Sequence, residues 1–319
     1  MSIKIVQFTH PGGQSVLSKR GRQSSLKEWN IGSHCRNFLI AKGQYVTGNA
    51  LADQQDLLFW GEWEPDSKII TSFNPPDPVL YPTYLHSPFL RLDKRGKVIK
   101  YNSKWNPTKR NSCSPTCSPF QNTDPFVFDE YFFYSLCRQE TFTSMKNLDA
   151  GSIILFGSTI SAKRGGPYFV LDTVFVVGEK RSYTAGNWQN DLSGFIPKYY
   201  DEIMGFGTWM NKNIPFTCYK GATFHHPVDG MYSFVPCKTA EEHGINGFSR
   251  AVLKSQELCS IISVPQIKQN KKTSKFISDN LNTAPKYTAS DLATNKQVWD
   301  KICQIIDSQG FKQGMNFKY

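Results

Sequence analysis

The sequence predicts an α+β fold that is dominated by strands and carries a C-terminal helix. Short segments rich in β-branched and aromatic residues recur along the chain, with turn residues between them. Helical periodicity is restricted to residues 199–210 and, more clearly, to residues 291–309. The chain has 319 residues, of which 39% are hydrophobic, 14% aromatic and 20% charged, so it is too apolar to be disordered and long enough to bury its own core.

The expected strands are bounded by glycine, proline and polar turn residues. In the expected C-terminal helix, one apolar stripe is formed by Val298, Ile302, Ile305 and Ile306, and Gly310 ends the helix. We expect strands at residues 3–8, 57–63, 68–72, 126–134, 152–157, 168–177 and 231–235.

Changes in composition suggest three parts and no internal repeat. Residues 1–262 are expected to form a composite core, with a barrel at about residues 123–262. Residues 263–290 are rich in Lys, Gln, Asn, Ser and Thr and predict a basic linker, followed by the C-terminal helical part at residues 291–319. Residues 102–122, with three prolines, predict a long loop.

Several classes of protein are not expected. The longest apolar stretches are broken by Asp or Gly well before the length that spans a bilayer, and residues 1–13 lack the apolar run of a signal peptide. Eight cysteines at irregular positions indicate reduced thiols and a cytoplasmic location. Cys113 and Cys117 lack the second pair that a zinc site would need, so we expect no metal and no cofactor.

The net charge of +11 is concentrated in three stretches, which predicts nucleic acid as the partner. Residues 1–30 carry +4, residues 91–110 carry +7 and residues 263–286 carry +4. Tyr101 and Trp105 interleave with the basic residues of the densest stretch, which suits phosphates and stacked bases. The alternative is that these lysines only keep the protein soluble. The expected backbone contacts are Arg91, Lys94, Arg95, Lys97, Lys100 and Lys104.

Two acidic residues are candidates for acid–base chemistry. Strand alternation would place Trp60, Glu62 and Glu64 on one face. In a pocket, repulsion and desolvation would raise the pKa of one carboxyl group and make it a general acid or base. The alternative is a solvated strand face, on which both residues pair with Lys or Arg.

A thiol and a histidine complete the candidate catalytic residues. Cys137 is followed by Arg138, and a neighbouring cation favours the thiolate, which is a competent nucleophile. The commoner role of such a cysteine is that of a small buried hydrophobe. His34 lies two residues before Arg36, which could hold an anionic ligand.

Two segments resemble the strands of PUA-like barrels, the group that includes ASCH, EVE and YTH modules. These are residues 148–157 (LDAGSIILFG) and residues 169–177 (FVLDTVFVV). Six further segments look like those of bacterial proteins associated with DNA base modification: residues 10–13, 34–39, 59–65, 123–128, 137–139 and 219–221.

The resemblance implies a role in making or recognising a modified base, with 7-deazaguanine modification of DNA as one setting. In such pathways a nitrile on the base is hydrated to an amide. Cys137 would then be the nucleophile, Glu62 the proton shuttle and His34 a further catalytic residue. Trp60 and Tyr219 would stack on a flipped base, and Trp63, Arg138 and Asp124 would line the same site.

Three functions therefore stay open at this point. The first is an enzyme that converts a modified base, acting on DNA, RNA or a free nucleoside. The second is a non-catalytic PUA-like reader of modified nucleic acid. The third is a scaffold subunit that docks other proteins of a modification or defence complex through its basic regions and its C-terminal helix.

Overall fold

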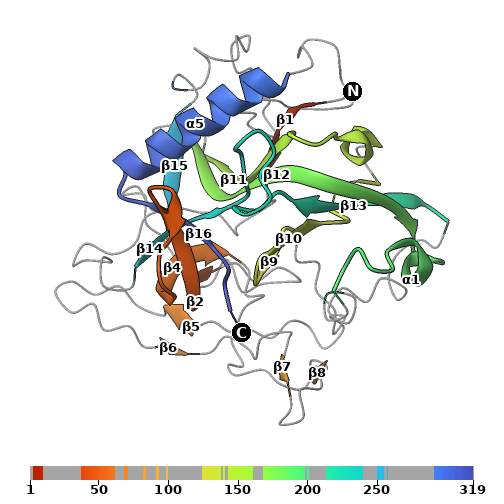
Figure 1. Cartoon of the computed structure of the whole chain (residues 1–319), viewed down its shortest axis with the longest axis horizontal. Coiled ribbons are helices and arrows are strands. Elements are labelled where there is room, and N and C mark those ends of the chain that lie inside the picture. The colour runs from red at the N-terminus through yellow and green to blue at the C-terminus, as the bar shows by residue number, and fades with distance from the viewer. Residues whose placement is uncertain are drawn as a thin grey trace.

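Strands dominate the structure, a computed structural model. It describes residues 3–9, 37–61, 68–70, 82–83, 91–92, 98–99, 124–137, 139–140, 143–160, 168–197, 200, 213–239, 250–254, 257 and 291–318. The chain forms an α+β fold with a small β-barrel and a long C-terminal helix, which confirms the predicted fold class (Figure 1).

The larger sheet is built around one long central strand, β12. Its path is β1-β11-β12-β13-β10-β9, and β15 also pairs with β12. All neighbouring strands are antiparallel except β1 and β11, which are parallel. The strands are β1 (Ile5–Thr9), β9 (Phe126–Phe128), β10 (Tyr131–Tyr134), β11 (Ile153–Ile160), β12 (Tyr168–Thr184), β13 (Pro215–Gly221) and β15 (Ala251–Lys254).

The second sheet closes on itself and forms the small barrel. Strand β2 pairs with β4, β4 with β14, β14 with β16, and β16 returns to β2. Phe59 and Phe317 are buried and pack together with ring centroids 4.6 Å apart. The ring strands are β2 (Asn37–Thr47), β4 (Gln55–Gly61), β14 (Val235–Thr239) and β16 (Lys312–Met315). Short strands β3 (Ala50–Leu51), β5 (Lys68–Ile70) and β6 (Pro82–Thr83) extend this sheet, and β7 (Arg91–Leu92) pairs with β8 (Val98–Ile99) separately.

Helix α5 (Leu292–Ser308) begins and ends where its sequence predicts. The Asp291 side chain accepts a hydrogen bond of 2.6 Å from the Thr294 N–H, and this contact lowers the pKa of Asp291. All four residues of the predicted apolar stripe are buried, and Gly310 takes a left-handed φ of 75° just beyond the helix. Figure 1 shows α5 lying beside β15. Within the described residues, no helix is long and apolar enough to cross a membrane.

Several predicted strands differ from the observed strands in where they begin or end. The predicted strand at residues 126–134 is a hairpin, because Asp129 takes a left-handed φ of 54° and reverses the chain between β9 and β10. Strands β2 and β16 were not predicted, and β12 runs seven residues beyond its predicted end. The predicted loop at 102–122, the linker at 263–290 and nearly all of the helix at 199–210 lie outside the described residues.

A β-bulge interrupts the pairing of β11 with β12. Thr173 lies opposite Phe156 and Leu171 opposite Gly157, so Asp172 is an extra residue without its own partner position in the ladder. A Cβ atom on Gly157 would overlap the Val170 carbonyl oxygen and lie 2.8 Å from the Phe169 ring. The bulge therefore requires glycine at position 157.

Replacing Gly157 with alanine should destabilise the protein. Because the added methyl group meets backbone rather than a movable side chain, we expect the free energy of unfolding to fall by about 1–3 kcal/mol. Gly48→Asn is the control, since no atom lies within 4 Å of that position and asparagine tolerates its φ of 60°. Denaturant titration measures both variants. Equal stability of Gly157→Ala and wild type would contradict the packing described for the bulge.

Candidate functional site

Four of the predicted site residues have described side chains, and they fall into two clusters. Cys137, Asp124 and Tyr219 lie around the turn that follows β10, whereas Trp60 lies on β4 in the barrel. Only the backbone of Arg91 is described, in β7. The other predicted residues lie outside the described part of the chain: Glu62, His34, Trp63, Arg138, Lys94, Arg95, Lys97, Lys100 and Lys104.

Asp124 holds the turn that carries Cys137. Its carboxylate is buried and accepts backbone N–H groups from three consecutive residues of that turn. The distances are 2.9 Å from Ser135, 2.9 Å from Leu136 and 2.5 Å from Cys137. Both carboxylate oxygens are therefore used within the protein. The sequence suggested a substrate contact for Asp124. That role stays a prediction, and the contacts that its carboxylate makes with the turn are structural.

Tyrosine hydroxyl groups hold the same turn from its other side. Tyr134 donates to the Cys137 carbonyl at 2.6 Å, and Tyr183 donates to the Ser135 carbonyl at 2.8 Å. The Tyr200 hydroxyl lies 2.8 Å from Ser135 Oγ. Burial raises the pKa of all three tyrosines well above the usual value, so they remain protonated and able to donate. The backbone N–H and C=O of Cys137 are thus both held by buried groups.

Cys137 differs from the other described cysteines in its surroundings. Cys218 and Cys237 are buried, and Cys237 donates to the Lys312 carbonyl at 3.6 Å. Cys303 is half-buried, but desolvation raises its pKa, as it does for Cys218. Cys137 is half-buried at the end of a turn whose backbone is fixed. Among the described thiols it combines partial exposure with a backbone that is held on both sides.

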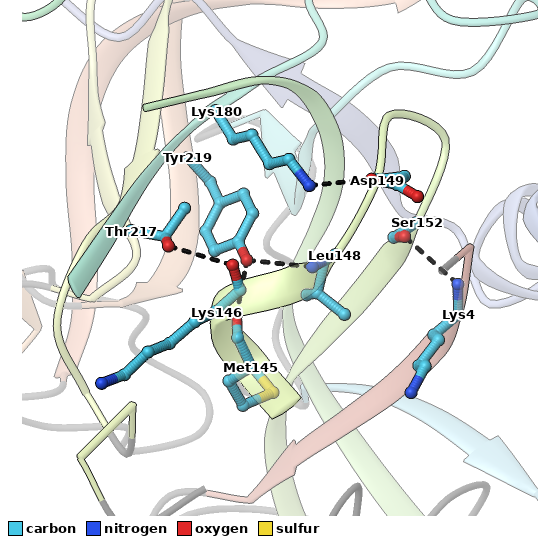
Figure 2. A network of polar contacts seen from close by, with 9 residues as sticks. All are labelled: Lys4, Met145, Lys146, Leu148, Asp149, Ser152, Lys180, Thr217 and Tyr219. Carbon is cyan, nitrogen blue, oxygen red and sulfur yellow. Dashed lines mark hydrogen bonds and ion pairs between the residues drawn. The ribbon is translucent and has the colours of Figure 1, made fainter. Parts of the chain in front are cut away.

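Tyr219 serves as an anchor for a neighbouring segment (Figure 2). Its hydroxyl donates to the Met145 carbonyl at 2.5 Å and accepts from the Leu148 N–H at 3.1 Å. The ring is fully buried and stacks on Tyr134, with centroids 5.7 Å apart. Burial raises the pKa of Tyr219, which keeps it a neutral donor. Its predicted stacking on a base stays untested, and its burial does not support that role.

The second cluster joins Trp60 to two residues that were not predicted as site residues. Trp60 is only 4% exposed, and the guanidinium carbon of Arg250 lies 4.6 Å from its ring centroid. Arg250 Nη2 in turn forms a buried ion pair with Asp172 Oδ1. One signal was available in the sequence, because Asp172 is the single charged residue in the apolar run from 168 to 177. The stacking of Trp60 on a base also stays a prediction that its burial does not support.

No metal centre is formed by the described residues: no three His, Cys, Asp or Glu side chains among them are grouped to hold an ion. His225 and His226 are exposed in the turn before β14. Adjacent residues of an extended chain point to opposite faces, so this pair was not expected to share an ion.

Comparison with protein-family models, with curated proteins and with solved structures gives no match.

Replacing Asp124 with asparagine should destabilise the turn. The amide has one acceptor oxygen where the carboxylate has two, and its NH₂ group would face backbone donors. We expect the free energy of unfolding to fall by about 2–4 kcal/mol, since buried N–H groups lose their acceptor. The matched control is Asp56→Asn, whose ion pair with Lys42 is exposed and should cost less than about 0.5 kcal/mol. Similar losses in the two variants would show that Asp124 does not hold the turn.

Proposed function

We propose that this protein binds DNA in the cytoplasm and converts a modified base of the 7-deazaguanine type, hydrating a nitrile to an amide. The observation that carries the proposal is the concentration of positive charge in three stretches of the sequence. The fixed backbone of Cys137 supports an enzyme over a reader.

Residues 1–30, 91–110 and 263–286 together carry +15, so all other residues together carry −4. Charge that was needed only for solubility would not have to be concentrated in this way. Segments rich in Lys and Arg are what a phosphate backbone requires of its partner.

The strand ends that neighbour three basic segments in the sequence lie at one end of the larger sheet. Strand β1 ends at Thr9, opposite Gly157, and the parallel strand β11 continues in the same direction to Ile160. Tyr168 begins β12 opposite Ile160, and Lys254 ends β15 opposite Tyr168. The segments that start at this end are residues 10–36, 161–167 and 258–290, with twelve basic and two acidic residues between them.

A balanced reaction can be written with Cys137 as nucleophile. Its sulfur adds to the nitrile carbon, one C–N π bond breaks, and the thiol proton is transferred to nitrogen, giving a thioimidate. Water then adds to that carbon. The C–S bond breaks, the thiol is restored, and the base carries an amide, so the net change is the addition of one water. In this proposal Glu62 moves the protons and His34 assists. Arg138 and Trp63 contact the base.

Removing the Cys137 thiol should abolish conversion. The test incubates purified wild type, Cys137→Ala and Cys303→Ala with duplex DNA containing a nitrile-bearing 7-deazaguanine, followed by digestion and nucleoside mass spectrometry. We expect the amide product from wild type and Cys303→Ala and none from Cys137→Ala. Cys303 serves as the control because it is the other half-buried thiol among the described cysteines.

The outcomes separate the proposed function from its alternative. Product from Cys137→Ala would remove Cys137 as nucleophile. If wild type leaves the base unchanged but binds modified DNA more tightly than plain DNA, the protein is a reader and the enzymatic proposal fails.

Basic residues of the 10–36 segment should contribute to the salt dependence of DNA binding. In a triple variant with Lys19, Arg20 and Arg22 replaced by Gln, the slope of log K against log salt should fall by about 0.9 for each phosphate that is no longer neutralised. The matched control replaces Lys42, Lys301 and Lys318, which changes the net charge equally but outside the three basic stretches of the sequence. Fluorescence anisotropy at several salt concentrations measures the slopes. Equal slopes for the two triple variants would attribute binding to total charge.

A further inference from the structure

The bulge of β12 places a buried carboxylate between the two sheets. Asp172 is 1% exposed, and it is the extra residue between Leu171 and Thr173 in the pairing with β11. A bulge redirects the side chain of the extra residue, and bulges are frequent beside functional sites. Apolar residues occupy most of this strand around Asp172, so the buried charge costs free energy of folding. An apolar residue at this position would not carry that cost.

Arg250 neutralises that charge and connects it to the barrel. The side chains of Arg250 and Asp172 are 1% and 0% exposed, and their ion pair joins the residue before β15 to the first half of β12. The planar guanidinium also lies over the indole of Trp60 on β4. A single arginine thus contacts the larger sheet through its ion pair and the barrel through the Trp60 ring.

Stability alone gives a weak reason for this arrangement. Two buried charges lose their hydration, and well-packed apolar side chains of similar size are often as stable or more stable. What the ion pair adds is position, because the carboxylate holds the guanidinium group at the place where it lies over the Trp60 indole. Trp60 is the last residue but one of β4, and Glu62 follows the strand directly.

We propose that Asp172 and Arg250 are positioning residues, which act through Trp60 to fix the end of β4 at Gly61, the residue that precedes Glu62 in the sequence. This inference rests on the proposed function for its catalytic consequence, since Glu62 is the proton shuttle there. The claim that Asp172 and Arg250 control the end of β4 does not depend on that function.

The decisive variant is Arg250→Lys, which keeps the positive charge beside Asp172 but removes the planar face against Trp60. Asp172→Asn removes the charge instead, and Trp60→Phe keeps a flat ring as the conservative change. The matched control is Lys42→Met, which breaks the exposed ion pair with Asp56 at the opposite end of β4. Thermal unfolding of each full-length variant gives the folded fraction used to correct the other measurements.

Two measurements are made on these variants. Hydrogen–deuterium exchange compares the peptide covering residues 57–64 with peptides from β10 and β13. Steady-state kinetics on the nitrile-bearing DNA separates kcat from KM. In Arg250→Lys and Asp172→Asn we expect faster exchange confined to residues 57–64 and a fall in kcat of about 10²-fold with KM unchanged, the cost of misplacing a reacting group. Trp60→Phe should retain most of the wild-type kcat.

Each outcome decides one point. Unchanged exchange at residues 57–64 in Arg250→Lys would overturn the inference whether or not the protein is an enzyme. Altered exchange with a wild-type kcat would overturn the catalytic consequence. If exchange at residues 57–64 changes in the variants but the wild-type protein makes no product, the positioning of β4 is supported and the proposed function is rejected.

Discussion

The structure depends most on the backbone hydrogen bonds of strand β12. Every polar group of a buried strand needs a partner, and this strand meets the requirement through three neighbouring strands and a bridge between Val174 and Phe234. That bridge joins the larger sheet to the chain just before β14 of the barrel. A change in the path of β12 would therefore move both sheets at once. Its regular pairing is interrupted at Asp172 opposite β11 and again between Val177 and Glu179 opposite β13.

The two residue clusters differ in what holds them. Around Cys137, neutral hydroxyl groups and one carboxylate hold a turn mainly through hydrogen bonds to its backbone, with one further contact between Tyr200 and the Ser135 side chain. Around Asp172, the described ion pair and cation–π contact join side chains from three separate strands or strand ends. The first cluster presents a reactive group, and the second controls the orientation of its neighbours.

Patterns within short segments explain which parts could be predicted from the sequence. The strand-rich class, helix α5 and its apolar stripe follow from local periodicity and from the residues at the helix ends. Strand β16 has the sequence Lys-Gln-Gly-Met, which has little strand propensity. It forms a strand only because β2 and β14 supply partners from distant parts of the chain. Asp129 reverses the chain with a left-handed backbone conformation, which asparagine and aspartate tolerate. A single aspartate is too weak a sequence signal to divide residues 126–134 into two strands.

The candidate site shows the same division. Cys137 and Asp124 were selected for their chemistry, and the structure brings them together. Side-chain type could not show that Tyr219 is fully buried, or that Trp60 faces Arg250, because both facts depend on residues far away in the sequence. Arg250 itself follows an acidic segment and has no local pattern that would distinguish it from a surface arginine.

The closed ring of the barrel has a consequence for biosynthesis. Its strands come from residues 37–61, 235–239 and 312–315, so the ring cannot close until residue 315 has left the ribosome. Strands β2 and β4 can pair with each other early, but the edge of β4 that meets β14 waits for residues 235–239, and the edge of β2 that meets β16 waits for residues 312–315. During this interval the nascent chain exposes strand edges that can join those of another molecule, and its folding is limited by contacts between segments far apart in the sequence.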